Sequence, residues 1–325
     1  MTKKKERYLI DTNIMLDQAS IIIPTFNAGQ WLQKLIHALK SQGIRPEQVF
    51  VIDSTSADNT ADEFRAYGAR VNVIPQCEFN HGATRQLAAN ICNTSPFLIY
   101  LTHDAIPIGS HAFHSILTSF ADPKVAMAYG RQIPREGASA IERHARLFNY
   151  PPVSEVRDLS CSTGYGVKTI FASDSFAAYR ASSLRDVGGF PLDCFFAEDQ
   201  IVAGRLLLAG YKLAYAADAC VIHSHGYSTK QDFQRYFDVG VYHARNPWIL
   251  DQFGKAEGEG LRFVKSELNY LLEDEPTSIP SALVRTVCKY VGYRVGRFEA
   301  RLSNQQKARL SMFPSYWRHQ QQSKS

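Results

Sequence analysis

The sequence predicts an α/β protein in which helices cover both faces of a mostly parallel central sheet, with a mainly helical extension at the carboxyl end. Short apolar runs alternate with helical patterns through the first half of the chain, and short loops join them. From Lys230 onward the pattern is mainly helical. We therefore expect one domain over residues 1–230, with halves at about 19–125 and 126–230, and a helical region over residues 231–325.

The first half of the chain shows the alternation most clearly. The run Ile21-Ile22-Ile23 ends at Pro24, and apolar residues at helical spacing follow in "WLQKLIHAL". A second strand, "VFVI", leads through Asp53 into a loop rich in Ser, Thr, Asp and Asn, and then into a helix. We expect a third strand in "ARVNVIP", a third helix in "HGATRQLAANICN" and a fourth strand in "PFLIYLTHDA".

The second half, after Asp122-Pro123, is less regular. It holds an expected strand in "VAMAYGRQIP", a helix in "SAIERHARLFNY" and a loop in "PPVSEVRDLSCSTGYGV" that is long enough to be mobile or functional. The segment that opens with "SDSFAAYRASSLRDVGGF" holds the start of a helix. A Gly-Gly turn, a helix opened by Glu198-Asp199, a strand and a terminal His-Ser-His follow it.

The composition is that of a soluble globular protein, with 45% hydrophobic and 21% charged residues in a chain of 325. No stretch reaches the roughly 18–20 apolar residues that span a bilayer. The basic start "MTKKKERYLIDTN" lacks the apolar run of a secretory signal. The six cysteines have no zinc-like or disulfide-like spacing, which indicates reduced thiols and a cytoplasmic location.

Polar residues stand where three of the expected strands end. Pro24-Thr25, Asp53-Ser54 and His103-Asp104 all occupy such positions. In sheets of this kind, ligands bind beyond the carboxyl ends of the strands. The sequence therefore predicts one shared cleft at that edge of the sheet.

Two of these positions allow both a structural and a binding interpretation. Asp53 fits a turn or helix cap, or an acceptor of hydrogen bonds from a base or ribose. Asp104 fits a turn, or a ligand of a divalent cation that also binds substrate phosphates. A third segment, at the start of an expected helix, is open in the same way. Gly82 and Arg85 fit either a capped helix with a solvated Arg or a phosphate-binding helix N-terminus.

The later part of the chain adds candidate acid–base and metal-binding residues. Glu198 and Asp199 fit the first turn of a helix, where acidic side chains interact favourably with the helix dipole. They also fit a general base that nearby phenylalanines partly desolvate. His223 and His225 are two residues apart at an expected strand end, so we expect their side chains to diverge. Their residue type fits one metal ligand among the two.

Taken together, these stretches resemble the inverting glycosyltransferases of family 2, which have a GT-A fold. The matching segments run in order from about residue 19 to 270. They are "IIIPTFNAG", "VFVIDSTSADNT", "FNHGATRQLAA", "YLTHDAIP", "GGFPLDCFFAEDQIVAGRLLLAGYKLAYAADACVIHSH" and "RYFDVGVYHARNPWILDQFGKAEGEGLRFVKSEL". Within the family, "FNHGATR", "THDA" and "HSHGYS" look most like bacterial enzymes that use dTDP-L-rhamnose to build surface polysaccharides.

The resemblance implies a role for each matching residue. Asp199 matches the catalytic base, and Asp104 matches the last residue of the DxD metal motif, which implies Mg²⁺ or Mn²⁺. His223 matches a late metal-ligating histidine, with His225 as the second candidate. The donor would be a dTDP-sugar, or alternatively a UDP-sugar such as one carrying galactofuranose or a hexosamine, and the acceptor a glycan or lipid-linked glycan. The residues implied to line the donor pocket are Pro24, Thr25, Asn27, Asp53, Arg85, His103 and Asp104.

The sequence departs from the family pattern at two points. The DxD position reads Thr102-His103-Asp104, so its first carboxylate is missing. The QxxRW signature of processive members is absent, since "QDFQRY" is a poor approximation to it. We therefore expect transfer of single sugars rather than polymerisation.

The carboxyl-terminal tail is basic, with nine Lys or Arg residues and one acid, Glu299, from Ser281 onward. Within it, "SALVRTVCKYVGYRVGRFEARL" is an amphipathic pattern that fits an anionic membrane surface, or a helix packed on its own domain or on a second copy. A nucleic-acid binder is disfavoured, because the basic residues are confined to the tail while carboxylates stand at the expected cleft. A sugar nucleotidyltransferase is disfavoured because its Gly-rich basic loop is missing near the first strand.

Overall fold

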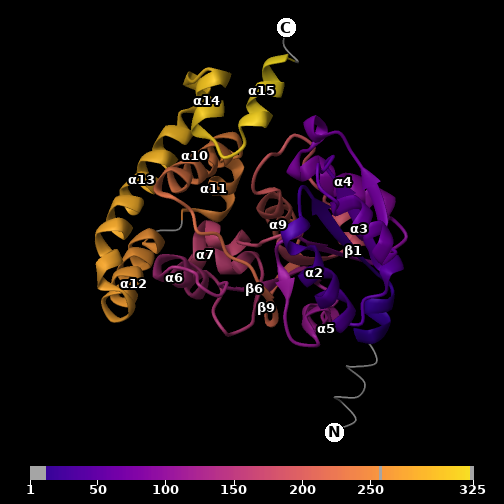
Figure 1. The fold of residues 1–325 in the computed structure, drawn as a ribbon. Coiled ribbons are helices and arrows are strands. Elements are labelled where there is room, and N and C mark those ends of the chain that lie inside the picture. Colours follow the sequence, from indigo (N-terminus) through magenta and orange to yellow (C-terminus); the bar gives the residue numbers. More distant parts are fainter. Residues whose placement is uncertain (1–11, 256–257, 323–325) are drawn as a thin grey trace.

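A nine-stranded sheet forms the centre of the computed structural model, which describes residues 12–255 and 258–322 (Figure 1). The basic cluster at the amino terminus lies outside these residues. The strands are β1 (Ala19–Thr25), β2 (Val49–Asp53), β3 (Arg70–Val73), β4 (Phe97–Leu101), β5 (Ile106–Pro107), β6 (Val125–Ile133), β7 (Glu155–Arg157), β8 (Phe176–Arg180) and β9 (Lys212–Ile222). Their order is β3-β2-β1-β4-β8-β6-β9-β5, and β7 also pairs with β9.

The sheet is mixed rather than mostly parallel, which corrects the sequence prediction. Strands β3, β2, β1 and β4 are parallel, as the strand–helix alternation predicts. Strand β8 runs antiparallel between β4 and β6, and the short strands β5 and β7 run antiparallel to β9. Strands β6 and β9 are again parallel to each other. The α/β class with a helical carboxyl-terminal region is confirmed.

The sequence does not predict strand β8; the helix start expected in this stretch is α8 (Ala181–Asp186), directly after the strand. Its residues "FAAYR" include two alanines, which favour helices. Both neighbouring strands, however, pair with this segment, and Phe176, Ala177, Ala178 and Tyr179 are all buried. Burial between two strands outweighs the local helix preference here.

Helices cover both faces of the sheet, and each face has its own apolar core. One core packs α2 (Gly29–Ser41), α3 (Thr60–Tyr67) and α5 (Ala112–Thr118) against residues such as Ile21 and Ile23 of β1. The other packs α4 (His81–Ile91), α8 (Ala181–Asp186) and α9 (Glu198–Leu208) against residues that include Ile22. Since Ile21, Ile22 and Ile23 are all buried, β1 is apolar on both faces, as expected for a parallel strand between two helical layers.

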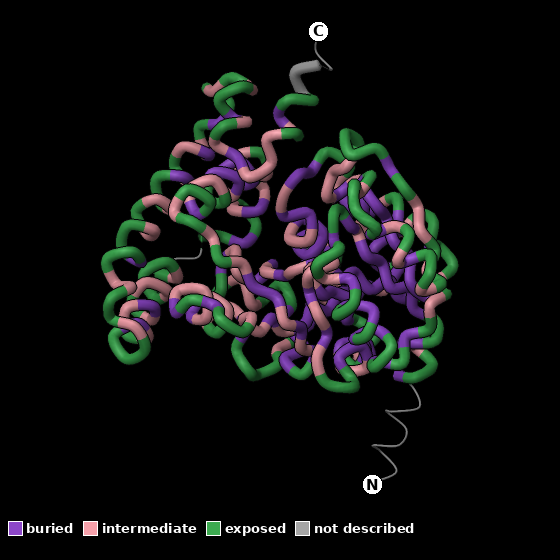
Figure 2. Tube along the Cα trace, in the orientation of Figure 1, coloured by how far each residue is buried: buried purple, intermediate pink, exposed green. Residues whose placement is uncertain are grey.

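The remaining helices lie mainly in the carboxyl-terminal third of the chain, on the left in Figure 1. Figure 2 shows that buried residues concentrate around the sheet, while the outer side of α13 is largely exposed. These helices are α6 (Ala140–Asn149), α7 (Ser162–Tyr165), α10 (Thr229–Arg245), α11 (Pro247–Phe253), α12 (Glu259–Asp274), α13 (Ile279–Arg297), α14 (Asn304–Leu310) and α15 (Pro314–Gln322).

Glycines allow α13 to pack closely against α10. A Cβ added at Gly292 would lie 2.3 Å from the carbonyl oxygen of Phe233, and one at Gly296 would lie 2.1 Å from that of Phe237. A Cβ at Gly240 on α10 would likewise lie 2.3 Å from the carbonyl oxygen of Tyr293. The two backbones therefore approach too closely for any side chain at these positions.

We expect Gly296→Ala to destabilise the protein by about 1–3 kcal/mol, because the added methyl group must push the two helices apart. The control is Gly260→Ala on α12, where an added Cβ meets no atom within 4 Å. Because Ala is the better helix former, that change should be neutral or stabilise by up to about 0.5–1 kcal/mol. Urea unfolding measures both, and a similar shift for the two variants would contradict the close packing of α10 and α13.

Candidate active site

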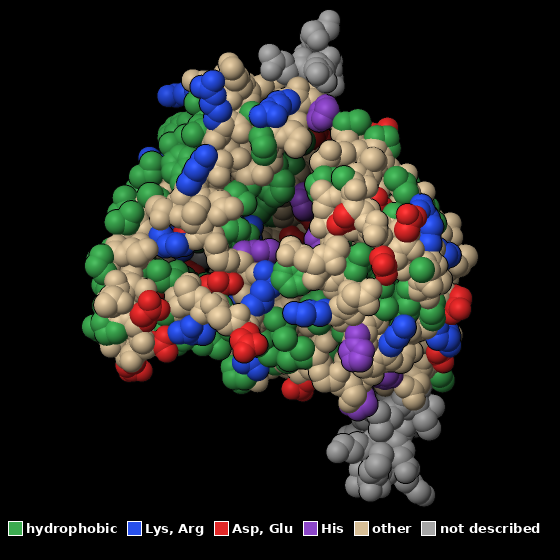
Figure 3. All heavy atoms as spheres, viewed as in Figure 1, with side chains coloured by type: hydrophobic (Ala, Val, Ile, Leu, Met, Phe, Trp, Pro, Cys, Tyr) green, Lys and Arg blue, Asp and Glu red, His purple; other side chains and the backbone are tan. Residues whose placement is uncertain are grey.

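The carboxyl ends of β1, β4 and β9 open into one cleft of about 900 Å³. Figure 3 shows this hollow at the centre of the molecule, with acidic and histidine side chains on its floor. Helices of the carboxyl-terminal region also contribute to its lining, through residues 313–319. Of the residues predicted from the sequence, the lining includes Pro24, Thr25, Arg85, His103, Asp104, Asp199, His223 and His225.

Two predicted residues, Asn27 and Asp53, are not part of this lining; Asn27 is exposed and Asp53 is buried. The Asp53 carboxylate is buried and accepts hydrogen bonds from the Thr25 hydroxyl at 3.0 Å and from the backbone N–H of Ser56 at 2.9 Å. Asn27, at φ 47°, accepts a hydrogen bond from the backbone N–H of Ala57 at 2.8 Å. Both side chains therefore tie the loop after β1 to the loop after β2, and their contact with a nucleotide stays a prediction.

Asp104, His223 and His225 form a compact group of possible metal ligands. The Nε2 atom of His223 lies 3.5 Å from Oδ1 of Asp104, and Nε2 of His225 lies 3.9 Å from Oδ2. One ligand atom from each residue lies within 4.8 Å of the others. The expectation that the two histidines diverge is wrong, because β9 ends at Ile222 and the alternation of a strand no longer applies.

The imidazole of His223 is oriented by further hydrogen bonds behind it. Its Nδ1 lies 3.0 Å from Oε1 of Gln132, whose Nε2 in turn donates to the Ser173 hydroxyl at 2.9 Å. The amide oxygen thus accepts the Nδ1 proton, which leaves the Nε2 lone pair toward Asp104. Burial lowers the pKa of His223 and lowers that of His225 to about 3, so both rings are neutral and able to bind a metal at neutral pH.

The neighbours of Asp104 also include Arg135, which the sequence analysis did not single out. The Arg135 guanidinium lies 2.9 Å from Oδ2 of Asp104 and stacks over the Trp31 ring at 4.4 Å. Thr102 stands in place of the missing first carboxylate and lines the cleft. Its hydroxyl is buried and has no hydrogen-bond partner among residues 12–255 and 258–322. A polar atom of this kind is available to a ligand in the cleft.

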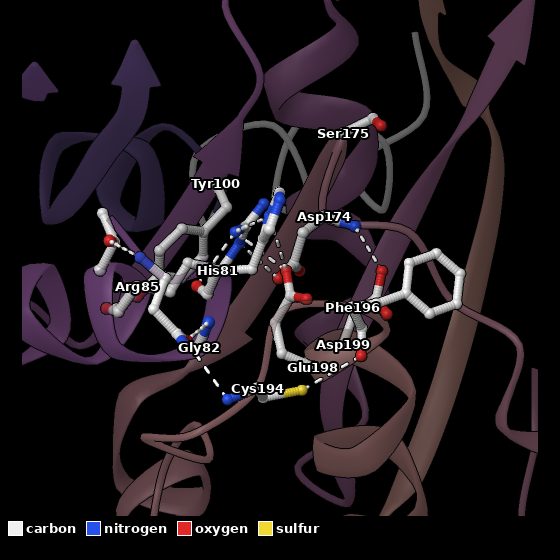
Figure 4. A network of polar contacts seen from close by, with 12 residues as sticks. His81, Gly82, Arg85, Tyr100, Asp174, Ser175, Cys194, Phe196, Glu198 and Asp199 are labelled. Atoms are coloured by element: carbon white, nitrogen blue, oxygen red, sulfur yellow. Dashed lines mark hydrogen bonds and ion pairs between the residues drawn. The ribbon is translucent and has the colours of Figure 1, made fainter. Parts of the chain in front are cut away.

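The same cleft is also lined by a cluster of three carboxylates around one arginine (Figure 4). The Arg85 Nε lies 2.9 Å from Oδ2 of Asp174, and its Nη1 lies 2.9 Å from Oε1 of Glu198. The side chains of Arg85, Asp174 and Glu198 are all buried. The sequence predicts Arg85 as a phosphate ligand, which stays a prediction, but in this structure its charge is matched by two carboxylates.

The amino terminus of α4 is likewise occupied by protein groups. The Asn80 side chain accepts hydrogen bonds from the N–H groups of Gly82 and Ala83, and Gly82 N–H also donates to the Cys194 carbonyl at 3.1 Å. A Cβ at Gly82 would lie 1.9 Å from the Pro191 carbonyl oxygen. The glycine thus lets the segment before α9 approach α4, and the geometry is that of the capped helix rather than of a phosphate-binding helix N-terminus.

Asp199 lies in the first turn of α9, on the cleft side of the acid cluster. Its Oδ2 accepts a hydrogen bond from the backbone N–H of Asp174 at 3.2 Å. Burial, together with the charges of Glu198 and Asp174, raises the pKa of Asp199 well above the ordinary range of an aspartate. A cleft carboxylate with raised proton affinity is suited to act as a general base.

Two arginines that the sequence did not identify also line the cleft, and neither has a carboxylate within ion-pair distance in the described part of the chain. Arg235 of α10 packs its guanidinium against the rings of Phe196 and Tyr227, at 5.4 and 5.6 Å. Arg146 of α6 lies over Tyr150 at 6.0 Å, and its buried Nε has no hydrogen-bond partner among those same residues. No spacing in the sequence links them to the site, because each comes from a helix whose docking brings it there.

Comparison with known proteins gives a consistent result. The family model described as glycosyl transferase family 2 matches residues 20–188. The O-antigen chain rhamnosyltransferases WbaN of Salmonella anatum and RfbN of Salmonella typhimurium are 44% and 43% identical to this chain, each over 94% of it and 98% of the relative. The fold is similar to that of the mannosyltransferase PcManGT from Pyrobaculum calidifontis in complex with GDP-Man and Mn²⁺, with a TM-score of 0.55, 18% identity, and coverage of 95% of this chain and 88% of that one.

We expect Asp104→Asn and His223→Ala each to weaken Mn²⁺ binding by more than about tenfold, because each removes one ligand from a small set. The amount of free Mn²⁺, measured by electron paramagnetic resonance during titration of the protein, reports this affinity without any substrate. His37→Ala is the control, since His37 is exposed on α2 and outside the cleft lining. Equal Mn²⁺ affinity in all four proteins would rule out the trio as a metal site.

Proposed function

This chain belongs to glycosyl transferase family 2, and from that premise we propose that it transfers L-rhamnose from dTDP-L-rhamnose to a hydroxyl of a saccharide acceptor in O-antigen synthesis. The observation that carries the proposal is that the Asp104–His223–His225 trio and Asp199 share one cleft. Two O-antigen rhamnosyltransferases match almost the whole chain, which supports rhamnose as the sugar. A UDP-sugar donor is the alternative.

The donor set of the trio fits a divalent cation bound together with a diphosphate. One carboxylate and two neutral imidazoles leave coordination positions open, and the unpartnered Thr102 hydroxyl lies in the same cleft. Imidazole nitrogen suits Mn²⁺ better than Mg²⁺, which prefers oxygen ligands. When bound, the cation supplies Lewis-acid stabilisation of the charge on the leaving nucleoside diphosphate.

Arg146 and Arg235 support the placement of the diphosphate in this cleft. Both are cations without a carboxylate partner in the described ranges, whereas Arg85 and Arg135 face carboxylates. A diphosphate entering a cleft lined by Asp104, Asp199 and Glu198 meets net repulsion unless cations are available. Arg146 and Arg235 provide them, and their guanidinium groups suit phosphate oxygens.

Asp199 accepts the proton of the acceptor hydroxyl in the proposed reaction. The resulting oxygen nucleophile attacks the anomeric carbon of the donor sugar from the side opposite the diphosphate, the new C–O bond forms as the bond to the diphosphate breaks, and the configuration inverts. Glu198 and Asp174 remain paired with Arg85 and hold Asp199 in place through the backbone N–H of Asp174. The raised pKa of Asp199 matches the need for a base that binds the proton strongly.

Asp199→Asn should lower kcat for rhamnosyl transfer by about 10²–10⁴-fold while dTDP still binds, because only proton acceptance is removed. In the wild type, kcat/KM should fall as the pH falls through the raised pKa of Asp199, so the acidic limb should lie above the ordinary aspartate pKa of about 3.9. Nucleotide release from dTDP-L-rhamnose and from UDP-sugars measures rate and donor preference together.

The control for this variant is Asp218→Asn, because Asp218 is exposed on β9 and outside the cleft. It should keep wild-type kcat. Wild-type turnover in Asp199→Asn would reject the general base, and release from a UDP-sugar in preference to dTDP-L-rhamnose would reject the proposed donor.

A contact between α13 and an anionic membrane surface completes the proposal. No helix among the residues described has the length and apolar character to cross a bilayer. Five residues of α13 nevertheless form an exposed apolar stripe, the α13 stripe, with Arg294 exposed on the same helix. The stripe consists of Leu283, Val284, Val287, Tyr290 and Val291.

Only part of the amphipathic pattern that the sequence predicts for α13 is exposed in the structure; the other part packs on the protein. Val295 packs inward against the cluster around Trp317. Arg285 lies 3.0 Å and Lys289 4.0 Å from the carboxylate of Asp232 on α10. Part of the basic pattern therefore holds α13 on its own domain, while the α13 stripe stays exposed and fits the apolar side of a lipid interface.

Val284→Glu/Val287→Glu should abolish flotation of the protein with vesicles of phosphatidylglycerol and phosphatidylethanolamine, because charge in the α13 stripe opposes burial in the lipid interface. Val156→Glu, at an equally exposed apolar position on β7, should float like the wild type. Flotation unchanged by the double substitution would reject the membrane contact, and a concentration-dependent dimer in analytical ultracentrifugation that the substitution abolishes would assign the α13 stripe to a second copy instead.

A further inference from the structure

Aromatic side chains from widely separated segments meet in the cleft beside the acid cluster, and the proposed chemistry uses none of them. Phe195 and Phe196 come from the segment before α9, and His81 opens α4. Phe313 and Tyr316 come from the carboxyl-terminal segment that precedes and begins α15. This last segment lies far beyond residue 188, where the match to the family model ends.

Phe313 lies at the centre of this group. Its ring centroid is 5.2 Å from that of His81 and 5.7 Å from that of Phe195, and both contacts are edge-to-face. His81 in turn lies 3.8 Å from the Glu198 carboxylate, so the aromatic group adjoins the acid next to Asp199. Burial lowers the pKa of His81 to about 4, which leaves a neutral ring able to hydrogen-bond a hydroxyl at neutral pH.

The segment that carries Phe313 is firmly attached to the rest of the protein. Trp317 is 1% exposed and packs with Phe195, Phe237 and Val241. The Tyr316 ring stacks on Phe195 at 4.5 Å, and its hydroxyl donates to Asp193 at 2.8 Å. The rings are therefore fixed in place before any ligand binds, which lowers the cost of binding.

We propose that Phe313, with Phe195, Tyr316 and His81 around it, forms the subsite for the pyranose ring of the saccharide acceptor. The apolar C–H face of a pyranose packs against an aromatic ring, and its hydroxyls need a few polar groups at the edge, here His81 and Ser315. A sugar in this position presents its ring beside Glu198 and Asp199, where the reacting hydroxyl must lose its proton. The proposal rests on the proposed rhamnosyl transfer.

This assignment places the acceptor and the donor on different parts of one cleft. The donor diphosphate belongs with Asp104 and Arg146, and Arg235 lies at the border of the two parts, because its guanidinium packs both on Phe196 and on Tyr227, whose ring stacks on His225. The aromatic group consists of neutral side chains and offers mostly apolar surface, which suits a neutral sugar rather than a phosphate. Acceptor recognition is thus assigned to a segment outside the matched family domain.

The test measures dTDP release from dTDP-L-rhamnose by the full chain, alone and with a panel of p-nitrophenyl pyranosides as acceptors. At least one glycoside should accelerate release above the rate of hydrolysis by water. Phe313→Ala and Phe313→Leu, which keeps an apolar side chain without the aromatic ring, should each raise KM for that glycoside about tenfold, the effect of losing roughly 1.4 kcal/mol of contact energy. The hydrolysis rate and the dTDP affinity should stay within about twofold of the wild type, and Phe313→Tyr should restore the acceptor KM.

Phe298→Ala is the matched control, because Phe298 is 49% exposed after α13 and outside the cleft, so it should leave every value unchanged. An unchanged acceptor KM in both Phe313→Ala and Phe313→Leu would overturn the subsite, as would a panel in which no glycoside accelerates release. Hydrolysis of dTDP-L-rhamnose keeps the two proposals separate. If the wild type does not hydrolyse dTDP-L-rhamnose, the proposed donor is rejected. If it does, and the Phe313 variants keep the wild-type acceptor KM, only the acceptor subsite is rejected.

Discussion

The buried ion pairs of Arg85 are the interaction on which the rest of the site depends. They join three segments that are distant in the chain: α4, the loop before β8 that carries Asp174, and the first turn of α9 that carries Glu198. Without the guanidinium, two buried carboxylates would lie together with no compensating charge. Asp199 accepts its hydrogen bond from the backbone of Asp174, so its position follows from this pairing. Its pKa is raised first by burial and then by the charges of Glu198 and Asp174, which the pairing holds nearby.

The sequence was sufficient to predict the edge of the sheet where the site lies, but not how its charges pair. Carboxyl ends of neighbouring strands meet, so Thr25, His103 and Asp104 could be assigned to one cleft from the order of strands and helices alone. The sequence shows an arginine at the start of a helix, but not that Asp174 and Glu198 fold against it. Nor does it show that residues 191–194 approach this helix and accept the hydrogen bond of the Gly82 N–H. Strand β8 was missed for a related reason, because its alanines favour a helix and only pairing with β4 and β6 makes it a strand.

The carboxyl-terminal region illustrates the same limit. Its helices were predictable from periodicity, and so was an apolar face on α13. Which face of α13 is covered depends on Gly292 and Gly296, which lie four residues apart and let α10 approach. The convergence of Phe313 and Tyr316 on the cleft has no periodic signal at all, because it depends on where Trp317 anchors the last helix.

The loss of the first carboxylate at Thr102 has an electrostatic consequence for the proposed reaction. A divalent cation held by two carboxylates has no net charge left, whereas one held by Asp104 and two neutral imidazoles keeps one positive charge. In the proposed reaction, that charge and those of Arg146 and Arg235, which line the same cleft, would stabilise the negative charge on the leaving diphosphate. A site with one carboxylate also binds the cation less tightly than a site with two, so the diphosphate itself must supply part of the coordination. Metal and donor should therefore bind cooperatively, each increasing the affinity of the protein for the other.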